Sequence, residues 1–190
     1  MYSCPLRAKA RNVSYTRPLA FTRKKKKHEM EDKNFWDLIE SAWEKSGKNK
    51  DRKKAIETND EETLEELSQF IEIELIGFYQ TELEKLDKND FIAYIHHFEN
   101  KLYQIDREEI HEYTDGSDDG FLYCRCFILA MGKEYFNMID GNPSKAKFDL
   151  EAEEFGFEAY MYYEKNFSEE FERNSIHCIE SCSNPKGWKN

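Results

Sequence analysis

The sequence has no long hydrophobic run, and its longest apolar stretch, residues 126–131, is six residues long. A helix that crosses a bilayer needs about 20 such residues, so a transmembrane protein is excluded and we expect no membrane partner. The first 30 residues also lack the continuous apolar segment of a secretory signal. With five cysteines and no such signal, the chain is predicted to be a cytoplasmic protein with free thiols.

Also absent are the short motifs that place a nucleophile or a phosphate group, because the chain has no Gly-X-Ser-X-Gly, no P-loop and no Gly-X-Gly-X-X-Gly. Its two cysteine pairs, Cys124 with Cys126 and Cys178 with Cys182, lack the Cys-X-X-Cys spacing of common zinc sites. We therefore interpret these cysteines as ordinary buried thiols and assign no catalytic residue, metal or cofactor.

Charge is distributed unevenly along the chain. Residues 1–29 hold nine Lys or Arg and one Glu, a net charge of +8, and the whole chain carries −11, so residues 30–190 carry −19. A surface this acidic repels phosphate backbones, which argues against nucleic-acid binding by that part of the chain. We expect a basic protein partner instead.

Residues 1–29 show no periodic apolar pattern and end close to a run of five basic residues at positions 23–27. We predict a disordered basic leader, followed by one helical domain over residues 30–190. Two explanations of the leader stay open: a targeting segment or anchor for anionic surfaces, and an untranslated region read as protein ahead of Met30. We favour the second.

From Glu31 onward, apolar residues recur at three- and four-residue spacing, which predicts an all-α bundle of about five or six helices. The polar, lysine-rich residues 46–54 are expected to connect two of them, and a short helical turn at Ala55 and Ile56 is left open. Beyond Asn166 we predict an irregular tail that docks one tryptophan, Trp188. The helices are expected at about residues 31–45, 58–86, 89–105, 121–131, 133–139 and 149–165.

The loop Ser117-Asp118-Asp119-Gly120 precedes the most apolar of these helices. Adjacent carboxylates repel each other unless something neutralises them, so the pair could hold a divalent cation or a basic side chain of a partner. The alternative, which we favour, is helix capping, in which Ser117 or an aspartate accepts the free N–H groups and negative charge suits the helix N-terminus.

Arg125 lies in that same apolar helix, where an unpaired guanidinium would cost several kcal/mol. Its partner is expected among four carboxylates, Asp118, Asp119, Glu153 and Glu154. We predict a structural ion pair that fixes the loop to the core, in preference to an arginine that binds substrate.

Three histidines, His96, His97 and His111, offer weak metal or acid–base candidates. Adjacent side chains on a helix point about 100° apart, so His96 and His97 cannot both enter one site. We expect surface or capping roles for them, with His111 kept as a secondary candidate.

The central signature of one known family is carried by residues 118–123 (Asp-Asp-Gly-Phe-Leu-Tyr), Arg125, Cys126, Gly132, Tyr135, Asn142 and Pro143. On these motifs the chain resembles the family known as domain of unknown function 4240. Further residues that extend the resemblance over positions 30–188 are Phe35, Trp36, Ile39, Glu153, Glu154, Phe155, Ala159, Tyr163, Ser183, Asn184, Gly187 and Trp188. The resemblance implies a compact helical bacterial protein, fused in some members to a Trp-Gly-Arg-type module, and it carries over no activity or catalytic residue.

Two functional hypotheses follow. The first is a noncatalytic cytoplasmic protein-binding or regulatory module whose acidic helical face recognises a basic partner. The second is a small metal-dependent hydrolase or transferase that uses Asp118, Asp119 and His111. We favour the first, because the chain lacks the usual scaffolds of catalysis and its domain is strongly acidic.

Overall fold

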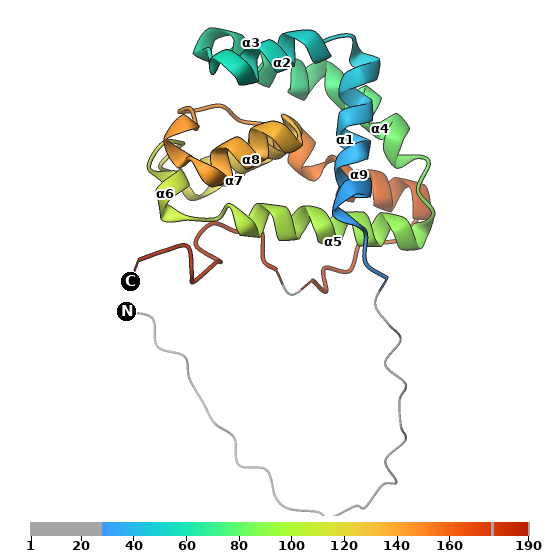
Figure 1. Ribbon diagram of the computed structural model, residues 1–190. Coiled ribbons are helices and arrows are strands. Elements are labelled where there is room, and N and C mark those ends of the chain that lie inside the picture. The colour runs from blue at the N-terminus through green and yellow to red at the C-terminus, as the bar shows by residue number, and fades with distance from the viewer. Residues whose placement is uncertain (1–27, 176, 190) are drawn as a thin grey trace, which may run out of the picture.

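The computed structural model describes residues 28–175 and 177–189. This part of the chain is mainly helical and contains no strand, which confirms the all-α prediction (Figure 1). The predicted disordered leader falls on residues 1–27, which lie outside the described residues, and on His28 and Glu29.

The described residues form eight helices, if the continuous helical segment from Glu61 to Leu83 is counted once. That segment comprises α3 (Glu61–Phe70), a π-helical turn (Ile71–Leu75) and α4 (Ile76–Leu83). The remaining elements are α1 (Asp32–Ser46), α2 (Asn49–Thr58), α5 (Lys88–Gln104), α6 (Glu108–His111), α7 (Asp118–Ala130), α8 (Lys133–Gly141), a 3-10 turn (Pro143–Lys145) and α9 (Glu153–Phe167).

The predicted number of five or six helices was too low, because α2 and the single turn α6 were missed. Helix α2 presents a buried face that includes the charged residue Arg52, so apolar periodicity underestimates it. The Arg52 guanidinium lies 5.1 Å from the centre of the Trp43 ring and donates to the carbonyl oxygen of Met131 at 3.3 Å. The aliphatic part and the planar guanidinium of Arg52 therefore take the place of an apolar side chain on this face.

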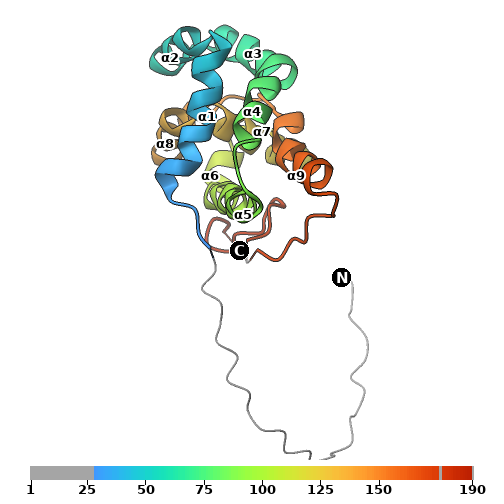
Figure 2. The same cartoon turned by 90° about the vertical axis from the view of Figure 1, so that its right-hand side faces the viewer.

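Helix α7 is the central element, since all but a few residues of its first turn and Tyr123 are buried. It packs against α5, α8 and α9, while α1 runs alongside α4 (Figures 1 and 2). The Trp43 indole of α1 donates to the carbonyl oxygen of Ala130 at the end of α7, with a donor–acceptor distance of 2.7 Å. This hydrogen bond connects α1 to the central helix, α7.

The irregular tail, residues 171–175 and 177–189, follows α9 and runs past α5, as Figures 1 and 2 show. Its docking depends on Asp106, a fully buried carboxylate just after α5. Oxygen Oδ1 of Asp106 accepts from the Cys182 amide and the Trp188 indole, both at 3.0 Å. Oxygen Oδ2 accepts from the Ser183 hydroxyl at 3.1 Å and the Asn184 amide at 2.8 Å. The predicted docking of Trp188 is confirmed, and a buried acid fixes it.

Candidate functional site: an acidic strip beside helix α7

The loop before α7 is a helix cap. The Ser117 hydroxyl accepts from the amide of Gly120 at 3.0 Å, and Asp118 and Asp119 occupy the first turn with exposed side chains. Their charge is stabilised there by the positive end of the helix dipole. The capping interpretation of Ser117 is thus confirmed.

Arg125 is fully buried, as predicted, but its predicted carboxylate partners were wrong. The guanidinium donates to the carbonyl oxygens of Leu102 at 3.1 Å and Ile179 at 2.8 Å, and to the Ser181 hydroxyl at 3.2 Å. Within the described residues it makes no ion pair with Asp118, Asp119, Glu153 or Glu154. Burial lowers the pKa of Arg125, against the attraction of Asp106.

The reason for this correction is geometric. Arg125 lies almost two turns into α7, where its side chain reaches the C-terminal end of α5 and the tail. Carbonyl groups at a helix end have no partner within the helix, and a buried carbonyl needs a donor. Arg125 supplies that donor, so it fixes the tail.

His111, the secondary candidate, packs among aromatic rings. Its ring centre lies 5.0 Å from that of Phe121 and 5.3 Å from that of Trp188. In the part of the chain that the structure describes, no group of histidines has the spacing of a metal site, and His97 instead approaches Asp32 at 3.4 Å. The structure therefore does not bring His111 into a cluster with other metal ligands.

The main feature near the α7 loop is a group of like charges that we call the acidic strip. Its members come from the π-helical turn, the loop before α7, the first turn of α7 and the start of α9: Glu72, Asp115, Asp119, Asp149, Glu151, Glu153 and Glu154. All seven are at least partly exposed. Segments distant in sequence thus build one acidic surface.

The strip residues lie close enough to change one another's ionisation. Burial raises the pKa of Glu151, and the charge of Asp149 raises it further. Burial raises the pKa of Glu72 as well, with a further contribution from Glu154 and despite the hydrogen bond from the Glu154 amide at 3.2 Å. Both shifts mean that the charged forms of Glu72 and Glu151 are less stable than that of a solvated glutamate.

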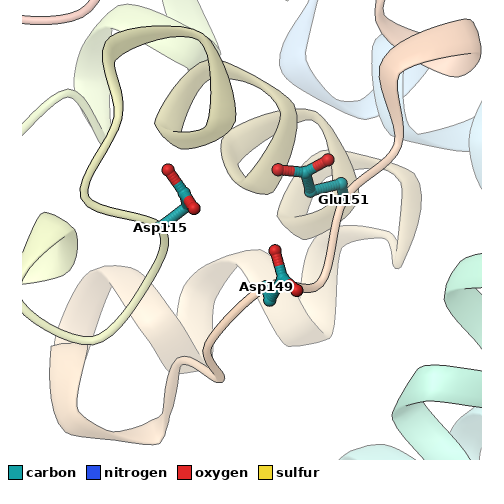
Figure 3. A group of neighbouring side chains, drawn as sticks. All are labelled: Asp115, Asp149 and Glu151. Atoms are coloured by element: carbon teal, nitrogen blue, oxygen red, sulfur yellow. The ribbon is translucent and has the colours of Figure 1, made fainter.

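Three members of the strip form a tighter group. One carboxylate oxygen each from Asp115, Asp149 and Glu151 lies within 4.8 Å of the other two. Figure 3 shows the three carboxylates around a common space between the loop before α7 and the segment before α9. Asp115 also accepts from the amide and hydroxyl of Ser117, both at 2.5 Å, and these bonds lower its pKa.

No strip carboxylate makes an ion pair with any of the described residues. Some acids elsewhere are paired, as Asp32 shows: it lies 2.6 Å from the ammonium of Lys101 and 2.9 Å from that of Lys133. These two lysines lower the pKa of Asp32 despite its partial burial. The strip is therefore a local excess of unneutralised charge, and one oxygen of Glu72 is buried with no hydrogen-bond donor in the described chain.

Two large exposed apolar side chains are sequence neighbours of strip residues. Ile73, next to Glu72, is 79% exposed, and Phe148, next to Asp149, is 64% exposed. The π-helical turn contributes to this arrangement, because it places Glu72 half-buried against the start of α9 while Ile73 points to solvent. Such turns occur often at functional sites.

The cysteines divide into two kinds. Cys124 and Cys126 are buried, as predicted, and burial raises the pKa of each thiol to about 12. Cys178 and Cys182 lie exposed in the tail, so the prediction of buried thiols was wrong for this pair. The reason is that the tail docks through its backbone and through Trp188, which leaves these two side chains outside. All four are free thiols.

These features define a helical protein with a buried aromatic core and an unpaired acidic strip, and no helix in its described part is long and apolar enough to cross a membrane. The chain belongs to the family described as "Protein of unknown function (DUF4240)", which matches residues 30–170. This match confirms the resemblance seen in the sequence. Comparisons with curated proteins and with solved structures gave no match.

Proposed function

We propose that the protein is a noncatalytic binding module of the cytoplasm that takes a basic protein segment on the acidic strip. The observation that carries this proposal is the set of seven neighbouring carboxylates without an ion pair in the described chain. The four free thiols support a reducing compartment.

The energetics favour a cationic ligand. Burial and, after it, neighbouring like charges raise the pKa of Glu72 and of Glu151, so the ionised forms of these two residues are destabilised. A lysine or arginine placed among these carboxylates would relieve the repulsion. A charge-complementary partner would also be steered toward the strip at long range.

The flanking apolar side chains specify the partner further. Ile73 and Phe148 are too exposed to contribute much to the core, and they are the sequence neighbours of Glu72 and Asp149. Burying such side chains against a partner contributes about 25 cal/mol per Å² of apolar area. The expected ligand therefore combines Lys or Arg with apolar residues at short spacing.

This proposal predicts that a labelled peptide of alternating lysine and leucine binds the protein and that strip variants weaken it. The variant Asp119→Asn/Glu151→Gln/Glu154→Gln removes three strip charges. Surface ion pairs contribute about 0.2–1 kcal/mol each, so the loss should total about 1.5 kcal/mol, which is roughly tenfold in Kd. Fluorescence anisotropy of the labelled peptide measures the Kd of each variant.

The matched control is Glu57→Gln/Glu134→Gln/Glu164→Gln, which removes the same net charge from exposed positions outside the strip. It should change Kd less than twofold at physiological salt, where charges beyond about 8 Å are screened. Equal weakening by both triple variants would show that binding follows net charge alone and would remove the strip from the proposal. A peptide affinity that does not change with salt would do the same.

A second candidate function is divalent-cation binding by Asp115, Asp149 and Glu151, whose oxygens lie within 4.8 Å of one another. This group differs from the Asp118 and Asp119 pair of the sequence hypothesis, because those two side chains are exposed in the α7 first turn and outside the group. Calcium takes six to eight oxygen ligands, so water would complete the shell.

Cation binding at this group predicts a rise in thermal stability with calcium or manganese, because a ligand of the native state stabilises by mass action. At 100 times Kd the gain is about 2.7 kcal/mol. The variant Asp115→Asn/Asp149→Asn should abolish it, whereas Asp118→Asn should not. An unchanged melting temperature in millimolar cation would eliminate this candidate and leave the peptide-binding proposal untouched.

A further inference from the structure

We propose that Cys178 and Cys182 form a reversible disulfide and that the docked tail favours its formation. Both thiols are free and exposed, so a small reagent can reach each of them. Neither cysteine belongs to the acidic strip, and the pair therefore goes beyond the proposed function and is independent of it. The disulfide would be a modification site that makes docking of the tail sensitive to thiol oxidation.

The tail folds back on itself between the two cysteines. The Ser183 hydroxyl, which also bonds Asp106, donates to the carbonyl oxygen of Cys178 at 2.8 Å. This bond keeps the Cα atoms of Cys178 and Ser183 within about 8 Å of each other, and Cys182 directly precedes Ser183. A disulfide needs Cα atoms about 4.4–6.8 Å apart, so the turn places the two cysteines close to the required spacing.

The segment between the cysteines is fixed to the core at several points. Buried Arg125 donates to the carbonyl oxygen of Ile179 at 2.8 Å and to the Ser181 hydroxyl at 3.2 Å. Buried Asp106 accepts from the Cys182 amide at 3.0 Å. Docking therefore removes in advance much of the backbone freedom that closing a disulfide ring would otherwise cost.

Cys182 has an uncommon backbone conformation. Its φ is +63°, in the left-handed region that residues with a Cβ atom rarely adopt. Strain of this kind persists only where the surrounding structure holds it, and here the bond from the Cys182 amide to Asp106 does so. The docked tail thus holds a conformation of the turn that the same segment seldom visits as a free peptide.

The two thiols differ in how readily they react. Cys178 lines a pocket of about 260 Å³, which gives a reagent room beside the sulfur. Desolvation by burial, and after it the charges of Asp106 and Asp118, raise the pKa of Cys182, so its thiolate forms less readily. Cys178 is therefore the thiol that attacks the reagent, and Cys182 is the one that completes the disulfide.

The oxidant in this reaction is a small disulfide, such as oxidised glutathione. The Cys178 thiolate attacks one sulfur of the reagent, which releases one molecule of thiol and leaves a mixed disulfide on Cys178. The Cys182 thiolate then attacks the Cys178 sulfur and releases the second molecule of thiol. The protein loses two electrons and two protons, and the reagent gains both, so the reaction is balanced and reversible.

Coupling between docking and oxidation is reciprocal. If the docked tail favours the disulfide by a given factor, the disulfide favours the docked tail by the same factor. Fixing the backbone of even one residue in advance corresponds to roughly a tenfold gain in ring closure. Oxidation should therefore slow hydrogen exchange of the Asn184 amide, which bonds Asp106 at 2.8 Å, by about tenfold as well.

The test compares the full chain carrying Cys4→Ser with a synthetic peptide of residues 174–186, the tryptic fragment that contains both cysteines of the tail. Each is equilibrated with the same mixtures of reduced and oxidised glutathione, and free thiols are then alkylated. Mass spectrometry of the fragment gives the ratio of disulfide to dithiol. This ratio should be about tenfold higher in the protein than in the peptide.

The variant Asp106→Asn should lower the ratio in the protein toward that in the peptide, because it loosens the tail. The control Asp119→Asn, on an exposed residue, should leave the ratio unchanged. A ratio in the unsubstituted tail equal to or below that in the peptide would overturn the inference. A raised ratio that Asp106→Asn leaves unchanged would also contradict it, since docking would then not be the cause. Neither result bears on peptide binding by the acidic strip.

Discussion

The substitution Asp106→Asn is expected to destabilise the protein by about 2–4 kcal/mol, one of the two largest effects that we predict. The Asp106 side chain is fully buried and accepts four hydrogen bonds from the tail. Asparagine has the same shape, but its NH₂ group must replace one of the two oxygens. In either orientation of the asparagine amide, two hydrogen-bond donors of the tail face the NH₂ group, which donates and cannot accept.

The two orientations of the new amide differ in which contacts they lose. With NH₂ at the Oδ1 position, the Cys182 amide and the Trp188 indole lose their acceptor; at Oδ2, Ser183 and Asn184 lose theirs. A buried donor without a partner costs about 1–3 kcal/mol. The tail should therefore loosen before the helices unfold.

Urea unfolding measures the predicted loss, and hydrogen exchange of the Asn184 amide locates it in the tail. The matched control is Asp119→Asn, the same chemical change on an exposed residue, which should alter stability by less than about 0.5 kcal/mol. Destabilisation by Asp106→Asn without faster exchange in the tail would contradict the role assigned to this carboxylate.

Helical periodicity predicted most of the fold because most helices bury an apolar stripe. It failed for α2, where Arg52 occupies a core-facing position and is covered by Trp43 and a carbonyl group. It also missed the π-helical turn, Ile71–Leu75, because a single wide turn leaves the apolar spacing on either side nearly unchanged. Charged core positions and local changes of helical pitch leave no clear signal in one sequence.

The site was predictable only in part. Ser117 and the two aspartates after it stand together in the sequence, so capping could be inferred. Asp149 and Glu151 lie more than 30 residues further along, and only the packing of α9 against α7 brings them near Asp115. For Arg125 the sequence predicted burial but not the partners, because carbonyl groups are present at every residue and carry no sequence signature.

Arg125→Met is the second substitution with a large expected effect, a loss of about 3 kcal/mol. Methionine fills similar space without charge, so the penalty for burying a guanidinium disappears. The carbonyl oxygens of Leu102 and Ile179, however, lose the donor that Arg125 supplies, at about 1–3 kcal/mol each. The exposed Arg173, which lies over the Tyr160 ring at 4.5 Å, provides the control Arg173→Met, with an expected loss below about 1 kcal/mol.

The double variant Asp106→Asn/Arg125→Met decides whether the tail docks as one unit. Asp106 holds residues 182–188 and Arg125 holds residues 179–181, so both substitutions release the same segment. Once one substitution has released the tail, the second removes contacts that are already broken. The loss of stability in the double variant should therefore be smaller than the sum of the two single losses by at least about 1 kcal/mol. Strict additivity of the two losses in urea unfolding would show that the two buried charges act independently, and that the tail has no cooperative docked state.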